Sequence, residues 1–129
     1  MLAVMLALRE CGYALYLPFG ENTRTDLLIE DGRGIWRVQC KTGRLRKGAV
    51  VFAVCSTYGH HRNPRTARRS YRGQVDYFAV YCPETKGAYL VPLSDVPTRA
   101  SATLRVTPTR NGQRRHVRLA AQYQLAPAS

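Results

Sequence analysis

Residues 26–41 constrain the fold of this chain more than any other part of the sequence. Two segments rich in Leu, Ile, Val and Trp, residues 27–30 and 34–41, flank the sequence Asp-Gly-Arg-Gly at residues 31–34. Apolar segments on both sides of a glycine-containing reversal are typical of a β-hairpin, because glycine readily adopts the positive φ angles that a tight turn needs. The sequence therefore predicts a hairpin here.

The predicted turn also fixes which residues of the hairpin lie opposite each other. A two-residue type II′ turn centred on residues 32–33 places Asp26 directly opposite Gln39, and opposed side chains share one face of a sheet. Because side chains alternate along a strand, Lys41 lies on that face as well. The sequence thus predicts that a carboxylate, an amide and an amine converge at the open end of the hairpin.

This arrangement resembles the catalytic motif of the PD-(D/E)xK nuclease superfamily, in which an Asp opens a hairpin and an acidic-x-Lys triplet follows on the next strand. Here the triplet is Gln39-Cys40-Lys41, with Gln in place of the acid. Gln at that position, together with residues 18–26, is similar to the branch of group I intron-encoded homing endonucleases and their phage and bacterial relatives. The resemblance covers about residues 12–93 and continues through residues 38–45, 71–81 and 88–92.

The resemblance implies an α/β fold of the α+β kind, with a restriction-endonuclease-like core in which helices flank a central mixed sheet. One nuclease-like domain is expected over residues 1–129, with its core at about 12–93 and a basic C-terminal extension at 97–129. Apolar residues at helical spacing predict a helix over residues 2–11, ended by Gly12. In the family the first helix begins earlier and carries a Glu that can join the metal site, and we do not transfer that role to Glu10.

The resemblance also implies metal-dependent hydrolysis of phosphodiester bonds. Asp26 is the expected Mg²⁺ ligand, with Mn²⁺ as a possible substitute, and the amide oxygen of Gln39 and the carbonyl oxygen of Cys40 can complete an oxygen-rich site. Glu21 is expected to contribute a further oxygen. Lys41 either orients or deprotonates the attacking water or stabilises the transition state, and the sequence does not choose between these roles.

The charge of the chain favours a polyanionic partner. Lys and Arg number 20 against 8 acidic residues, giving a net charge of +12. Residues 32–75 contain eleven basic residues and no acidic one. Contacts between basic side chains and phosphates provide most of the sequence-independent affinity of a protein for double-stranded DNA. The residues predicted to bind DNA are Arg24, Arg44, Arg46, Lys47, Arg62, Arg65, Arg68, Arg69 and Arg72.

Outside the hairpin, the apolar patterns predict several more elements. A short strand or extended segment is expected at residues 13–17, a third strand of the same meander at 49–55 and a second hairpin at 75–82 and 88–93. A short helical turn or loop is expected at 94–97 and an edge strand at 104–107. Asp76 opens the second hairpin. It is either a capping or salt-bridging residue beside Arg72 or a catalytic carboxylate.

The cysteines and the N-terminus indicate a protein of the reducing cytoplasm. The four cysteines, Cys11, Cys40, Cys55 and Cys82, form no Cys-x-x-Cys pair, so the sequence predicts neither a zinc ribbon nor a disulfide scaffold. A zinc site built from Cys55, His60, His61 and a distant cysteine is a weaker alternative. The apolar N-terminal segment lacks a signal-peptide pattern and is too short to span a membrane.

Three other functions fit parts of the same pattern. A Holliday junction resolvase would present two such sites symmetrically in a dimer. A DNA-binding module could retain the surface without the catalysis, and an RNA-binding protein could use the tyrosines for stacking. For a nuclease this small, cutting both strands predicts a homo-oligomer, a dimer or a tetramer.

Overall fold

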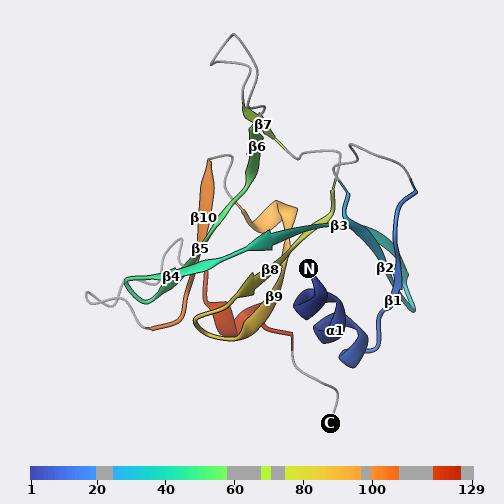
Figure 1. Ribbon diagram of the computed structural model, residues 1–129, viewed down its shortest axis with the longest axis horizontal. Coiled ribbons are helices and arrows are strands. Elements are labelled where there is room, and N and C mark those ends of the chain that lie inside the picture. The colour runs from blue at the N-terminus through green and yellow to red at the C-terminus, as the bar shows by residue number, and fades with distance from the viewer. Residues whose placement is uncertain (20–24, 58–67, 71–74, 97–99, 108–117, 126–129) are drawn as a thin grey trace.

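The computed structural model describes residues 1–19, 25–57, 68–70, 75–96, 100–107 and 118–125 (Figure 1). Five strands form the larger sheet in the order β1-β2-β3-β8-β9. These strands are β1 (Ala14–Tyr16), β2 (Leu27–Asp31), β3 (Gly34–Thr42), β8 (Tyr77–Cys82) and β9 (Gly87–Pro92). β3 and β8 pair in parallel, and the other neighbouring pairs are antiparallel. The predicted mixed sheet and both predicted hairpins are confirmed.

The hairpin of β2 and β3 has the predicted register but not the predicted turn. Asp31 pairs with Gly34 and Leu27 with Val38, which continues to Asp26 opposite Gln39. Gly32 does not take the left-handed φ that a type II′ turn requires. The Asp31 carboxylate holds the reversal instead, because its Oδ1 accepts hydrogen bonds from the backbone N–H groups two and three residues later, at 2.7 and 3.0 Å.

Three strands form a second sheet in the order β10-β5-β4, namely β4 (Arg44–Arg46), β5 (Ala49–Ala53) and β10 (Ser101–Arg105). The prediction that residues 49–55 form a third strand of the first meander is therefore wrong. The chain leaves the larger sheet at Gly43, where a Cβ would lie 2.6 Å from a Val50 methyl carbon and 2.8 Å from one of Val80. Because only glycine fits there, β4 and β5 can pack closely across the larger sheet.

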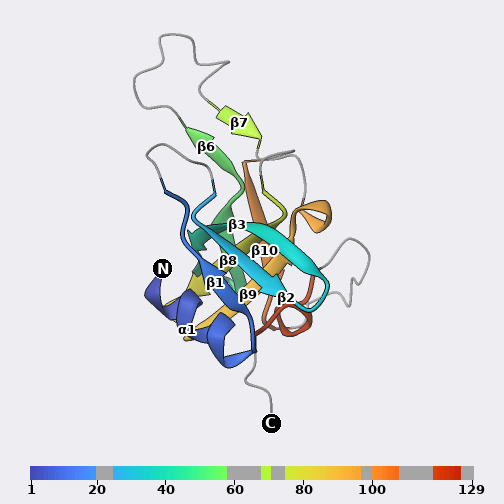
Figure 2. The same ribbon diagram turned by 90° about the vertical axis from the view of Figure 1, so that its right-hand side faces the viewer.

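Two antiparallel strands, β6 (Cys55–Thr57) and β7 (Arg68–Ser70), form a separate ribbon. Figures 1 and 2 show this ribbon projecting from the body of the molecule, beyond the ends of both sheets. The sequence predicts only a polar loop over residues 56–74. The basic pair Arg68-Arg69 thus belongs to a strand of the ribbon.

Two apolar clusters cover the two faces of the larger sheet. On one face, helix α1 (Leu2–Glu10) contributes Val4 and Leu8 to a cluster that contains Val38. The predicted cap is confirmed, since Gly12 has a φ of 95° directly after the helix. On the other face, Phe78 packs with buried residues of the second sheet such as Phe52. No helix in the described ranges has both the length and the apolar character needed to cross a bilayer.

The C-terminal part of the chain joins the two sheets. Strand β10 lies at the edge of the second sheet, as predicted for an edge strand, although it begins earlier than residue 104. Arg105 also forms a parallel bridge with Leu119, and Tyr89 of β9 forms an antiparallel bridge with Gln124. Two short 3-10 helices, η2 (Leu93–Asp95) and η3 (Ala120–Gln122), complete the described structure. Of the two alternatives for residues 94–97, a helical turn or a loop, η2 shows a helical turn at 94–95, and residue 97 lies outside the described residues.

Candidate active site at the open end of the hairpin

Asp26 lies one residue before β2, where its backbone and its side chain both contact β3. The Asp26 N–H donates to the Val38 carbonyl at 2.9 Å. Oδ2 accepts hydrogen bonds from Gln39 Nε2 at 2.9 Å and from the backbone N–H of Cys40 at 2.8 Å. These three bonds hold the carboxylate against the middle of β3, as the hairpin register predicts.

The amide oxygen of Gln39 is a buried polar atom without a hydrogen-bond partner in the described structure. It is the one side-chain atom of this kind among the described residues. A buried acceptor without a partner costs about 1–3 kcal/mol, so folded proteins rarely leave one unless a ligand uses it. The other carboxylate oxygen of Asp26, Oδ1, accepts no hydrogen bond from the described residues. Each of these two residues thus has one side-chain oxygen without a hydrogen-bond partner among the described residues.

Lys41 lies two residues after Gln39 on β3, so alternation places both side chains on one face of the sheet. The parallel register confirms this face, because Gln39 pairs with Phe78 and Lys41 with Val80, and both partners belong to the cluster opposite α1. The lysine side chain is half-buried. The structure thus brings the predicted acid, amide and amine to one face.

The side chain of Cys40 packs on the α1 face of the sheet, opposite Gln39 and Lys41, so the part of Cys40 near this site is its backbone. Burial, with the nearby Asp26 charge as a second cause, raises the pKa of the Cys40 thiol to about 12, so the thiol keeps its proton at neutral pH. Its N–H points at Asp26, and the C=O of a strand residue points to the same edge of the strand as its N–H. The Cys40 carbonyl therefore points to the edge of β3 on which Asp26 lies.

Arg37 extends this face of β3, and the sequence analysis did not single it out. The carboxylate of Asp76 accepts hydrogen bonds from the Arg37 backbone N–H at 2.8 Å and from the guanidinium at 3.2 and 3.3 Å. Burial alone would raise the pKa of Asp76, but these bonds outweigh it and lower that pKa. Asp76 thus forms a salt bridge, as one of the two predicted alternatives has it, but with Arg37; the predicted partner, Arg72, lies outside the described residues. Alternation of Arg37, Gln39 and Lys41 is the sequence signal for this placement.

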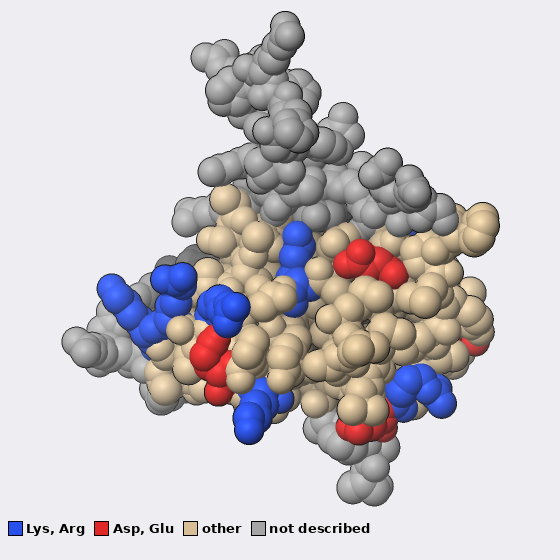
Figure 3. All heavy atoms as spheres, viewed as in Figure 1, with Lys and Arg blue, Asp and Glu red and all other residues tan. Residues whose placement is uncertain are grey.

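Several predicted site residues lie outside the described residues. They are Glu21, Arg24, Arg62, Arg65 and Arg72, and the alternative zinc ligands His60 and His61 also belong to this group. Of the predicted DNA-binding residues that the structure describes, Arg68 and Arg69 lie on β7, and Arg44, Arg46 and Lys47 are exposed at the end of β4. Figure 3 shows Lys and Arg side chains gathered at that end of the molecule.

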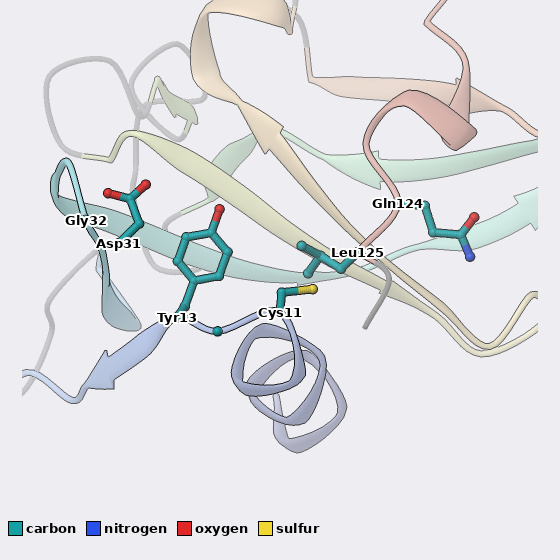
Figure 4. Close-up of a pocket in the computed structure, with 7 residues that line it drawn as sticks. Cys11, Tyr13, Asp31, Gly32, Gln124 and Leu125 are labelled. Carbon is teal, nitrogen blue, oxygen red and sulfur yellow. The ribbon is translucent and has the colours of Figure 1, made fainter. Parts of the chain in front are cut away.

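A cavity of about 490 Å³ lies elsewhere, at the closed end of the hairpin. Figure 4 shows Tyr13 and Asp31 at one side of it, with Cys11 and Leu125 above α1. Asp31 is five residues from Asp26 along an extended strand, roughly 16 Å, and alternation puts it on the opposite face. This cavity contains none of the residues predicted for catalysis.

The residues around Asp26 fit a hard divalent cation. Among the described residues no three His, Cys, Asp or Glu side chains gather in a metal-binding group. The oxygens present are of another kind, namely one carboxylate, one amide oxygen without a partner and one backbone carbonyl. Mg²⁺ and Mn²⁺ accept such oxygen ligands, and Mg²⁺ usually binds through one or two carboxylates, waters and phosphate oxygens.

The comparisons with known proteins point to the same class of enzyme. The fold is similar to that of the bacterial homing endonuclease I-Ssp6803I, with a TM-score of 0.67 and 25% sequence identity over 95% of this chain and 80% of that one. The sequence matches none of the curated proteins with which it was compared. A family model described as PD-(D/E)XK endonuclease matches residues 1–126, nearly the whole chain. The protein therefore belongs to the PD-(D/E)XK endonuclease family, a nuclease family that generally uses divalent metals.

Proposed function

We propose that this protein is a Mg²⁺-dependent endonuclease that hydrolyses phosphodiester bonds of double-stranded DNA, in the manner of a homing endonuclease. The observation that carries the proposal is the pairing of Asp26 with Gln39, whose buried amide oxygen has no hydrogen-bond partner in the described structure. Family membership and the similarity to a homing endonuclease support a nuclease. The oxygen set at the open end of the hairpin favours Mg²⁺, with Mn²⁺ as a substitute.

Three residues of this chain would hold the metal. They are Asp26 through Oδ1, Gln39 through its amide oxygen and Cys40 through its carbonyl. When bound, a divalent ion neutralises charge on the scissile phosphate and lowers the pKa of a water molecule. An amide in place of a carboxylate removes one negative charge from the site, so we expect weak metal binding without DNA and tighter binding when the phosphate, and in our proposal Glu21, supply further oxygens.

Lys41 provides the positive charge of the site. From the same face as Gln39 it can orient the attacking water, accept its proton as a neutral amine, or stabilise the charge that develops on the phosphate. A lysine that acts by charge can be replaced in part by arginine, whereas a lysine that acts as a base cannot. The two roles are therefore distinguishable by substitution.

Two basic regions would bind the DNA backbone. The β6–β7 ribbon carries Arg68 and Arg69, and a two-stranded ribbon has the dimensions of the major groove. The end of β4 carries Arg44, Arg46 and Lys47. Because one site cuts one strand, two copies of the chain would act together on a duplex, and a symmetric dimer or tetramer provides that arrangement.

A plasmid-nicking assay with the parent protein tests the proposed function. Conversion of supercoiled to nicked or linear plasmid is expected with Mg²⁺ or Mn²⁺ and is expected to stop with EDTA. A four-way junction offered in competition separates the two nuclease hypotheses, since a resolvase would cut the junction in preference to the duplex. If the protein binds duplex DNA but does not cut it with either metal, it is a binding module and the proposed function is wrong.

A further inference from the structure

The turn between β4 and β5 has an unusual residue at its tip. Arg46 pairs with Ala49 across a two-residue loop, and both loop residues lie in the left-handed region, Lys47 with a φ of 50° and Gly48 with a φ of 78°. These angles are those of a type I′ turn, which matches the twist of a hairpin and prefers Asn-Gly, Asp-Gly or Gly-Gly. A lysine at the first position is strained, because its Cβ disfavours this conformation.

Contacts from the far end of the chain hold the strained turn in place. Arg105 Nη1 donates to the Lys47 carbonyl at 3.1 Å, and the N–H groups of Val106 and Thr107 donate to the Gly48 carbonyl at 2.8 and 3.1 Å. A Cβ on Gly48 would overlap the Thr107 hydroxyl, so this approach needs glycine. Both turn carbonyls are therefore fixed by the end of β10, 58 residues later in the sequence.

The Arg105 guanidinium is itself fixed on its other side. Its Nε and Nη2 donate to the carbonyl and the hydroxyl of Thr107 at 3.2 and 3.3 Å. A guanidinium presents its donors in a rigid planar fork, so bonds to Thr107 on one side set the direction of the bond to Lys47 on the other. Arg105 thus acts as a clamp on the tip of the hairpin.

The clamped tip presents positive charge. Lys47 and Arg46 are exposed, and neither forms a salt bridge with a described residue. Arg44 differs, because its guanidinium lies 3.5 Å from a Glu84 carboxylate oxygen. The blue atoms at the β4 end in Figure 3 mark this part of the surface. The least compensated cations of the hairpin therefore sit at or beside its strained tip.

We infer that the β4–β5 turn is a pre-organised contact for a DNA backbone phosphate, in which Lys47 provides the ammonium and Arg105 is a positioning residue. Backbone strain that the surrounding structure holds in place is typical of functional positions. Asn or Gly at position 47 would relieve this strain but would lack the positive charge of the lysine. A lysine ammonium is a compact point charge that suits a phosphate rather than a base edge. The inference rests on the proposed function, because it takes DNA as the ligand.

The substitution Lys47→Asn separates the turn from the charge, since Asn-Gly is a preferred type I′ sequence. The melting temperature is expected to stay the same or rise by a few degrees, whereas duplex affinity, measured in EDTA, falls by roughly 8-fold at 0.1 M salt and the salt slope falls by about 0.9, as for one lost phosphate contact. Lys86→Asn is the matched control. Lys86 is also exposed, has a φ of 56° and precedes a glycine, but it lies on the β8–β9 turn.

Two results would overturn the inference. An equal loss of duplex affinity in the Lys47→Asn and Lys86→Asn proteins would mean that only net charge matters, and an unchanged affinity in Lys47→Asn would mean that Lys47 does not contact the DNA. A parent that does not bind duplex DNA would overturn the proposed function as well, so the two failures are distinguishable.

The substitution Arg105→Gln tests whether Arg105 positions the turn. It should weaken binding in the parent but have little further effect in the Lys47→Asn protein, whereas additive effects would show that Arg105 does not act through Lys47.

Discussion

The two ends of the β2–β3 hairpin each carry an aspartate, and the two carboxylates have opposite surroundings. At the closed end, both oxygens of Asp31 are used locally, by the N–H groups of Arg33 and Gly34 and by the indole N–H of Trp36 at 3.3 Å. At the open end, Asp26 accepts hydrogen bonds from described residues through Oδ2 but not Oδ1, and the Gln39 amide oxygen is buried without a described partner. The hydrogen bonds of the Asp31 carboxylate are made within its own turn, whereas among the described residues the Asp26–Gln39 pair leaves two side-chain oxygens without a partner.

In our proposal, this difference separates a residue that maintains the fold, Asp31, from residues that carry the chemistry, Asp26 and Gln39. A carboxylate whose hydrogen bonds are made by its own turn stabilises that turn, and fewer of its lone pairs remain for a cation. An acceptor pair that the fold leaves unsatisfied reduces stability and persists where it serves a function. The same residue type at two ends of one hairpin thus provides an internal control for every test of the site.

The largest expected effect is on cleavage by the two aspartate variants. Asp26→Asn keeps the size of the side chain but removes its charge, and it should reduce metal-dependent nicking by roughly 10³-fold or more, because the metal loses its only charged described ligand. Asp31→Asn should cut at nearly the parent rate under conditions where it is folded. Plasmid-nicking rates measure both. Equal loss of activity in the two variants would mean that the hairpin as a whole, and not its open end, supports cleavage.

The next effect concerns Lys41. Lys41→Ala should reduce the nicking rate by roughly 10²–10⁴-fold, while duplex affinity falls by no more than the roughly 8-fold expected for one lost phosphate contact at 0.1 M salt. Partial rescue by Lys41→Arg would indicate a role through charge, and no rescue a role as a base. The assignment is wrong if Lys41→Ala cuts like the parent.

A third pair of variants changes the unsatisfied oxygen itself. Gln39→Glu restores the charge that the family motif usually has and should retain cleavage or lower the metal concentration needed for half-maximal rate. Gln39→Leu removes the buried acceptor, so it should lose cleavage while the free energy of unfolding stays within about 1 kcal/mol of the parent or rises. A large loss of stability in Gln39→Leu would show that this side chain maintains the fold.

The smallest effect is a pH dependence of stability at the closed end. Hydrogen bonds from the backbone N–H of Arg33, and then of Gly34, lower the pKa of Asp31 below its ordinary value of 3.8. A lowered pKa gives stability that is present above pH 3.8 and lost as the pH falls through the folded-state pKa. Urea denaturation from pH 6 to pH 2 should give the parent a larger free energy of unfolding than Asp31→Asn at pH 6. The difference between the two free energies should become smaller as the pH falls to 2. A constant difference would contradict the bonding described for this turn.

The sequence predicts the local features of the site because they depend on strand periodicity. The register of Asp26 against Gln39 and the shared face of Lys41 follow from a two-residue turn and alternation alone. The turn type is not predictable in this way, since the Asp31 side chain replaces the glycine geometry. The family resemblance, which periodicity cannot provide, supplied the assignment of a nuclease.

The parts that the sequence does not predict depend on contacts between distant residues. The neighbour of β3 is β8, reached after a long connection and paired in parallel, whereas the sequence favours the adjacent strand over residues 49–55. The close approach at Gly43 sends that strand to the second sheet. Two further contacts also join residues that are distant in the sequence. They are the hydrogen bonds between Asp76 and Arg37, 39 residues apart, and the bond from Arg105 to the Lys47 carbonyl.

Direct measurement of metal binding tests the central claim, that the open end of the hairpin holds the divalent ion. Mn²⁺ binding would be followed by electron paramagnetic resonance with the protein bound to a duplex that carries a non-hydrolysable phosphate analogue. The parent and Asp31→Asn are expected to bind Mn²⁺ alike, Gln39→Glu to bind it more tightly, and Asp26→Asn to lose the bound ion. Mn²⁺ bound equally by the parent and by Asp26→Asn would contradict the account, because the metal would then lie elsewhere in the molecule.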